Sequence, residues 1–234
     1  MNTSFTASEF TLRNVRRDFP EWHRGRPSYA LWALNVDCVS VKSRINAAQH
    51  HLGKLLLDDY IRQSHITLSL CGFPCDVPQA PDDFGMDSLR TQIAALQRAR
   101  PQPFEIDIGD LASFTSAPYL TVNDEGGHIA KLRNCLALGD ADAANGSYTP
   151  HVTVGLYADA WPTSEVQVRL DSFAFDAPLR LRITSASWVS YAAAEIGGPL
   201  TTLVDYDFVS GTTSSQVAWV GQAAGDLGRI ELAG

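Results

Sequence analysis

Hydrophobic and polar residues alternate along two short segments of the chain, and each segment begins at a histidine. In residues 65–71 the apolar side chains of Ile66, Leu68 and Leu70 are separated by polar or small ones. Residues 151–157 show the same alternation. A period of two is typical of a strand with one buried face. We therefore expect two strands that each bury one face and carry a histidine on the other.

The rest of the hydrophobic pattern predicts a mixture of helices and strands. Apolar residues that recur at every third or fourth position indicate helices with one buried side, and these are expected over residues 40–59, 88–100, 128–138 and 163–169. Short apolar runs between turn-forming residues predict further strands, at residues 29–37, 103–114, 117–124, 173–175, 179–190 and 200–209.

Three regions of the chain differ in composition. The chain has 234 residues, of which 45% are hydrophobic and 19% charged, so it can form one large domain or two small lobes that share a core. Residues 1–28 are polar and locally basic, and we interpret them as an N-terminal arm. The folded domain is expected over residues 29–210, followed by a Gly, Ser and Thr-rich tail at 211–234 to which no function is assigned.

The net charge and the cysteine pattern exclude some classes of function. A formal charge of -8 argues against a protein that binds long nucleic acids by broad phosphate neutralisation, whereas a nucleotide or a short RNA end remains compatible. The four cysteines lack the spacing of a zinc site and are interpreted as free core thiols. No apolar run approaches the ~20 residues needed to cross a bilayer. We expect a cytoplasmic protein with no membrane partner.

The same tripeptide pattern, histidine, apolar residue, threonine, opens both alternating segments. It occurs as His65-Ile66-Thr67 and as His151-Val152-Thr153. Since residues i and i+2 of a strand share a face, each histidine lies beside its threonine. If the two strands lie side by side or across a cleft, all four polar side chains enter one space. We predict that they form one paired site.

Two histidines and two threonines match the needs of phosphodiester cleavage. One group must take a proton from the attacking hydroxyl or water while another gives a proton to the departing oxygen, and imidazole, with a pKa of about 6.5, can do either. Threonine hydroxyls can donate to the non-bridging phosphate oxygens as charge builds there. This chemistry requires no metal and no cofactor. The residues alone leave open which histidine is the base.

Two further residues are candidate substrate contacts. Tyr157 follows His151 and Thr153 on the alternating face, and Ser69 has the matching position after Thr67. Tyr157 could stack on a base or bond the substrate, and Ser69 could donate to it. The alternative for both is ordinary strand packing with the hydroxyl toward water.

The chain resembles the two-histidine (2H) phosphoesterase superfamily in the segments YIRQSHITL and YTPHVTV, which contain the paired motifs. That superfamily includes bacterial RNA 2′,3′-cyclic phosphodiesterases, also called 2′-5′ RNA ligases. The resemblance covers roughly residues 28–209 and implies an α+β fold of two lobes, each an antiparallel sheet backed by helices, with the active site in a cleft between them. It also implies that His65, Thr67, His151 and Thr153 are the catalytic residues.

The expected function is therefore hydrolysis of a 2′,3′-cyclic phosphate or a 2′-5′ phosphodiester in a nucleotide or short RNA, without a metal. Two alternatives remain open. One is a nucleotide-binding module without catalysis on the same fold, and the other is an enzyme that processes or joins RNA ends such as tRNA fragments. The base preference, the 2′- or 3′-phosphate product and the oligomeric state do not follow from the sequence.

Overall fold

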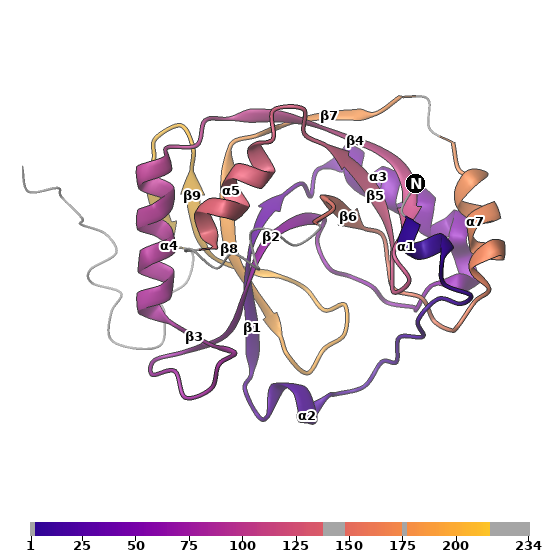
Figure 1. The fold of residues 1–234 in the computed structure, drawn as a ribbon, viewed down its shortest axis with the longest axis horizontal. Helices are drawn as coiled ribbons and strands as arrows, with labels where there is room; N and C mark the ends of the chain where they lie inside the picture. Colours follow the sequence, from indigo (N-terminus) through magenta and orange to yellow (C-terminus); the bar gives the residue numbers. More distant parts are fainter. Residues whose placement is uncertain (1–2, 138–147, 175–176, 216–234) are drawn as a thin grey trace, which may run out of the picture.

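Two sheets with helices packed on them make up the described part of the computed structural model, residues 3–137, 148–174 and 177–215 (Figure 1). The first sheet has the strand order β10-β9-β8-β1-β2-β3, and the second has the order β6-β5-β4-β7. All pairings are antiparallel except that of β2 with β3. The predicted two-lobed α+β fold is confirmed.

The strands of the first lobe come from both ends of the chain. They are β1 (Ser28–Asn35), β2 (His65–Cys75), β3 (Asp83–Gly85), β8 (Ser185–Ala192), β9 (Thr201–Asp207) and β10 (Thr213–Ser215). The second lobe is built from the middle of the chain, with β4 (Phe104–Ser113), β5 (Pro118–Asn123), β6 (His151–Thr153) and β7 (Leu179–Ile183). The helices are α1 (Thr3–Thr6), α2 (Pro20–His23), α3 (Val39–Leu52), α4 (Met86–Ala99), α5 (His128–Leu136) and α7 (Thr163–Asp171), with a 3-10 turn η1 at Gly53–Leu55.

One continuous hydrophobic core joins the two lobes. It contains Ile66 and Leu68 of β2 together with Val152 of β6, none of them more than 1% exposed. The helix α5, which follows β5 of the second lobe in the chain, packs on α4 and on β2, the strand of the first motif. Burial of this apolar surface is the main force that holds the lobes in one arrangement. In the described residues no helix is long and apolar enough to span a membrane.

The predicted strand at 179–190 is two strands that belong to different sheets. It breaks at Thr184, where β7 of the second lobe ends and β8 of the first begins. The Thr184 carbonyl accepts a 2.8 Å bond from the Phe208 amide, just beyond β9. The chain therefore returns to the first lobe after completing the second.

Two irregularities in β2 change which side chains face the core. The register with β1 shifts once before the pair Leu31↔Leu70 and once after the pair Trp32↔Ser69. At each shift β2 contains one residue more than β1. Such bulges interrupt the alternation of a strand. As a result Leu70 is 65% exposed, so the prediction that it is buried was wrong. Ser69 pairs with the fully buried Trp32, and Thr67 pairs with Ala33.

Several element boundaries also differ from the sequence predictions. The helix expected over 40–59 ends at Leu52, because Gly53 adopts φ +51°, a left-handed conformation that favours glycine and stops the helix. Phe173 and Ala174, in the strand predicted at 173–175, are irregular, and residue 175 lies outside the described residues. The short strands β3 and β10 were not predicted. The four cysteines are free, but Cys38 is exposed and not in the core.

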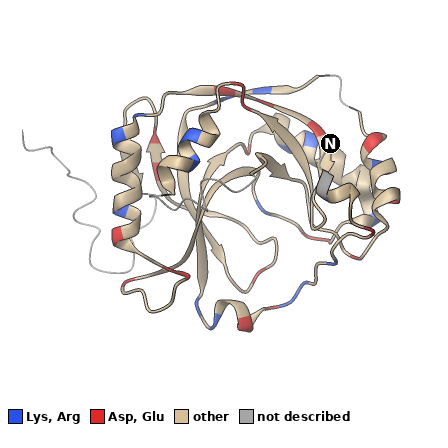
Figure 2. Ribbon diagram, viewed as in Figure 1, with Lys and Arg blue, Asp and Glu red and all other residues tan. Residues whose placement is uncertain are grey.

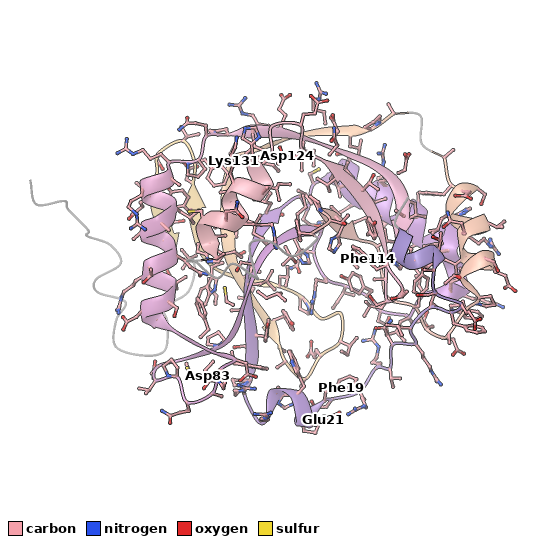
Figure 3. All side chains as sticks on the ribbon, in the orientation of Figure 1. Phe19, Glu21, Asp83, Phe114, Asp124 and Lys131 are labelled. Atoms are coloured by element: carbon pink, nitrogen blue, oxygen red, sulfur yellow. The ribbon has the colours of Figure 1, made fainter. Side chains whose placement is uncertain are left out.

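The N-terminal arm is packed along both lobes. The Thr11 amide donates to Trp161 of the second lobe, and the Asn14 side-chain amide donates to the Tyr157 carbonyl at 3.1 Å. Further on, Arg26 forms ion pairs of 2.7 and 2.8 Å with Asp82 and Asp83, beside β3. Phe19 and Glu21 of the arm and Asp83 of the first lobe lie along the same lower edge of the molecule (Figure 3).

Candidate active site

The two predicted motifs lie on β2 and β6, which belong to different sheets but have Cα atoms within 8 Å of each other. His65 and Thr67 lie on β2, and His151 and Thr153 form the ends of the three-residue β6. All four are partly buried, and the apolar residue inside each motif is fully buried. Neither strand contains a Lys, Arg, Asp or Glu residue, so both are tan in Figure 2.

Both histidine rings are held by the same local hydrogen bond. His65 Nδ1 lies 2.8 Å from the Gln63 carbonyl oxygen, and His151 Nδ1 lies 2.8 Å from that of Thr149. A carbonyl oxygen only accepts, so Nδ1 carries the hydrogen in both rings. In the neutral ring the acceptor is then Nε2. Each histidine therefore keeps its Nε2 atom for proton transfer.

The surroundings favour the neutral form of both rings. The pKa of His65 is lowered to about 4, mainly by burial; the bond to Gln63 opposes this effect, and the nearby charges of Arg62 and His151 add to it. Burial also lowers the pKa of His151, against the opposing bond to Thr149. Because a positive His151 disfavours protonation of His65, the two rings are close enough to interact electrostatically.

A tyrosine from each lobe reaches the threonine of the other lobe. The Tyr148 hydroxyl, just before the second motif, donates to the backbone carbonyl of Thr67 in the first. The Tyr60 hydroxyl, just before the first motif, hydrogen-bonds to the side chain of Thr153 in the second. These crossed contacts connect each motif strand to the segment that precedes the other motif. Neither tyrosine was predicted, because a tyrosine in a loop has no periodic signal.

Aromatic rings cover one side of His151. Phe114 stacks on Tyr119 with 4.3 Å between the ring centroids, and the two rings meet His151 edge-on at 4.9 and 5.4 Å. Phe114 lies beside the second sheet, toward the middle of the molecule, in Figure 3. Tyr119 pairs with Thr153 across β5 and β6, so it shares the face that carries the motif. These rings contribute to the burial that lowers the pKa of His151.

The structure corrects the prediction for Tyr157. Its side chain is fully buried, and its hydroxyl forms a 2.6 Å hydrogen bond with Ser113 Oγ in the core. The strand β6 ends at Thr153, so the alternation that placed Tyr157 beside His151 does not continue. Tyr157 pairs instead with Leu56 through an isolated bridge. It packs the second lobe and is not available to a substrate.

The structure also corrects the prediction for Ser69. The bulges in β2 pair it with Trp32 on the core side of the sheet, whereas Thr67 pairs with Ala33 on the other side. Cross-strand partners share a face, so Ser69 and Thr67 point to opposite sides. Ser69 is therefore not placed beside Thr67 to contact a substrate.

The motif residues offer groups for proton transfer and for hydrogen bonding to an anion. In residues 3–137, 148–174 and 177–215 no group of three or more His, Cys, Asp or Glu side chains is placed to hold a metal ion. The four motif residues provide two acceptors of protons and two hydroxyl donors on facing strands. This is a set of groups for acid-base chemistry on an anion.

Comparisons with known proteins agree with this arrangement. The sequence profile of the 2′-5′ RNA ligase superfamily matches residues 39–195. The apo structure of E. coli LigT is 14% identical with a TM-score of 0.51, covering 78% of this chain and 98% of that one. The E. coli LigT structure with ATP is also 14% identical, with a TM-score of 0.50 and coverages of 77% and 98%. TT0787 of Thermus thermophilus is 15% identical with a TM-score of 0.49, covering 77% and 97%. No curated protein matches the chain.

Proposed function

Because this chain belongs to the 2′-5′ RNA ligase superfamily, we propose that it is a phosphodiesterase that cleaves a 2′,3′-cyclic phosphate or a 2′-5′ phosphodiester by histidine acid-base catalysis. The substrate is a nucleotide or a short RNA, and the reaction uses no metal. The fold is that of E. coli LigT, a protein whose structure has been solved with ATP. A nucleotide ligand for this chain is consistent with that complex.

The observation that carries the proposal is the common tautomer of the two histidines. Each Nδ1 is committed to a carbonyl oxygen two residues earlier, at 2.8 Å, so that each Nε2 is the atom left for a proton. Two such atoms from facing strands can serve opposite sides of one phosphorus. In-line displacement at a phosphodiester requires such a pair, with a base at the nucleophile and an acid at the leaving oxygen.

The environments of the rings assign the two roles. His65 has the more strongly lowered pKa, so it is the ring that stays unprotonated and acts as the base. Its Nε2 takes a proton from water while the water oxygen bonds to phosphorus. In the molecules whose His151 is protonated on both nitrogens, this ring gives its Nε2 proton to the departing ribose oxygen as the phosphorus–oxygen bond breaks, and it is left neutral. Solvent exchange returns both rings to their starting states.

The threonines complete the scheme. Thr67 and Thr153 lie two residues after their histidines on the same strand faces, and their hydroxyls donate to the non-bridging phosphate oxygens. The crossed tyrosine contacts hold both strands at a fixed separation. Positioning of this kind removes the entropic cost of assembling the reacting groups during turnover.

A substrate panel with matched variants tests the proposal. The panel contains 2′,3′-cyclic mononucleotides, 2′-5′ oligoadenylates, cyclic dinucleotides and RNA that ends in a cyclic phosphate, with product identification. We expect wild-type turnover of at least one of the first two classes. His65→Ala and His151→Ala are each expected to lower kcat by about 10²- to 10⁴-fold with an unchanged circular dichroism spectrum. His50→Ala, at an exposed position late in α3, is the control.

The same panel separates the competing functions. Nucleotide binding without turnover of any substrate would instead support a binding module. Joining of RNA fragments with 2′,3′-cyclic and 5′-hydroxyl ends, without hydrolysis, would support an end-joining enzyme. Near wild-type activity in either alanine variant would refute the paired-histidine mechanism.

A further inference from the structure

The segment at residues 59–62 begins in a turn at Asp59, leads toward β2 and lies between the candidate active site and a surface groove. The segment is fixed by a bond from the Ile61 amide to the Gly197 carbonyl. Asp59 and Ile61 line a groove of about 290 Å³ together with residues of the N-terminal arm. The residues between and after them, Tyr60 and Arg62, interact with the catalytic residues.

Arg62 brings a positive charge next to the first motif. Its charge lowers the pKa of His65, and its guanidinium carbon lies 4.0 Å from the centroid of the Tyr191 ring. Its Nε donates a 3.0 Å bond to the Gly198 carbonyl. Tyr191 packs against the cluster that contains Ala33, and Ala33 pairs with Thr67, so the ring and the carbonyl hold the guanidinium on the face of the first sheet that carries the first motif.

The charge of Arg62 has no carboxylate partner in the part of the chain that the structure describes. No ion pair within 4.0 Å involves it, whereas Arg17, Arg26 and Arg180 all contact carboxylates. A guanidinium has five N–H donors; the bond to Gly198 occupies one of them and an interaction with the Tyr191 hydroxyl another. A partly buried cation with donors to spare near His65 favours an anion in that space.

Tyr60 supplies a second donor on the same segment. Its hydroxyl bonds to the Thr153 side chain, and the charge of Arg62 acts on it. Its ring is locked against Gly197, where an added Cβ atom would lie 2.8 Å from the Tyr60 ring. A side chain at position 197 would therefore displace the Tyr60 ring. Tyr60 and Arg62 thus extend the donor set of the two threonines.

We propose that Arg62 is the cation that binds the non-bridging oxygens of the substrate phosphate, with Tyr60 as a donor beside Thr153. This assignment rests on the proposed function. A cyclic phosphate carries one negative charge, and attack by water adds a second in the transition state. A guanidinium can form two parallel bonds to such a group, and these strengthen as the charge grows. Arg62 therefore acts in both substrate binding and turnover.

The variants Arg62→Gln, Arg62→Lys and Tyr60→Phe test this assignment, with Arg98→Gln on the exposed end of α4 as control. Two quantities are measured, the Kd of inorganic phosphate by calorimetry and the pH dependence of kcat/KM. Arg62→Gln is expected to weaken phosphate binding and kcat/KM by about 10- to 100-fold. Arg62→Lys should recover part of both, since it restores the charge but not the planar fork. Tyr60→Phe is expected to lower kcat more than it weakens phosphate binding.

The pH profile distinguishes a charge effect from loss of structure. Removing the positive charge of Arg62 raises the pKa of His65, so the acid limb of kcat/KM moves to higher pH in Arg62→Gln and stays in place in Arg62→Lys. The other charge acting on His65 is that of His151, and the neighbouring Asp37–Lys42 pair is neutralised within itself at 2.8 Å. Neither is altered by the substitution.

The outcomes separate this assignment from the proposed function. If the wild type turns over a substrate and Arg62→Gln keeps both phosphate affinity and the acid limb, the role of Arg62 is refuted and the phosphodiesterase stands. If the wild type turns over nothing but binds phosphate through Arg62, the anion site stands and the proposed reaction is refuted. If Tyr60→Phe leaves kcat unaltered, the role of Tyr60 as a donor beside Thr153 is refuted.

Discussion

Protonation of His65 should destabilise the folded protein, and the size of the effect follows from its environment. The pKa is about 4 in the folded state and about 6.5 in an unfolded chain. Since the fold favours the neutral ring, this contribution is fully present above pH 6.5 and is lost as the pH falls toward 4. Each pKa unit corresponds to about 1.4 kcal/mol, so the full loss below both pKa values is about 3 kcal/mol.

The measurement compares the wild type with His65→Gln, which removes the titrating ring but keeps a side chain with a donor for the Gln63 carbonyl. Urea unfolding at pH 7 and at pH 4.5 gives the free energy of unfolding of each protein. The wild type is expected to lose about 2 kcal/mol more than the variant between these two pH values. The exposed His50→Gln variant is the control and should behave like the wild type.

Equal losses in the wild type and in His65→Gln would refute the reasoning. They would mean that the site stays hydrated enough to hold a charged ring without cost. The assignment of His65 as the base would then lose its physical support, because it depends on the difference between the two rings.

Four further results are expected. If the lowered pKa values of His65 and His151 set the two limbs of the kcat/KM profile, its optimum lies below pH 6.5 in buffer-matched assays. Overnight dialysis against EDTA should leave kcat unchanged, and a loss reversed by a divalent metal would overturn the metal-free scheme. Tyr157→Phe should cost about 1 kcal/mol in urea unfolding with an unaltered KM, since its hydroxyl bonds to Ser113; a raised KM would contradict its place in the core. Gln92→Leu should cost about 1–3 kcal/mol in the same assay by removing the acceptor of the buried Trp32 indole, and a neutral result would show that this bond contributes nothing.

The sequence predicts those parts of the fold that depend on neighbouring residues. The period-two pattern at His65 and His151 correctly predicts strands there, because the pattern reflects one buried and one open face over a few residues. The catalytic role of the four motif residues stays a prediction. The structure does place the two motifs on adjacent strands, as expected.

Features that depend on distant parts of the chain were missed. The bulges beside Leu70 arise from the register with β1, and the break at Thr184 arises because the two lobes share one continuous stretch of chain. Nothing in the local pattern distinguishes a strand that changes sheets from one that does not. The contacts of Tyr60 and Tyr148 also depend on the opposite lobe, so only the three-dimensional arrangement shows them.

Because the chain returns to its first sheet, a fragment limited to the residues that match the superfamily profile would be structurally incomplete. A fragment of residues 39–195 keeps both histidine motifs but discards β1, which lies between β2 and β8, and β9 beyond it. The catalytic strand β2 would lose its antiparallel neighbour, and Trp32 and Leu34 would leave a gap in the core. Such a fragment should be insoluble, although its sequence contains every predicted catalytic residue. The functional unit of this protein is therefore longer than its recognisable signature.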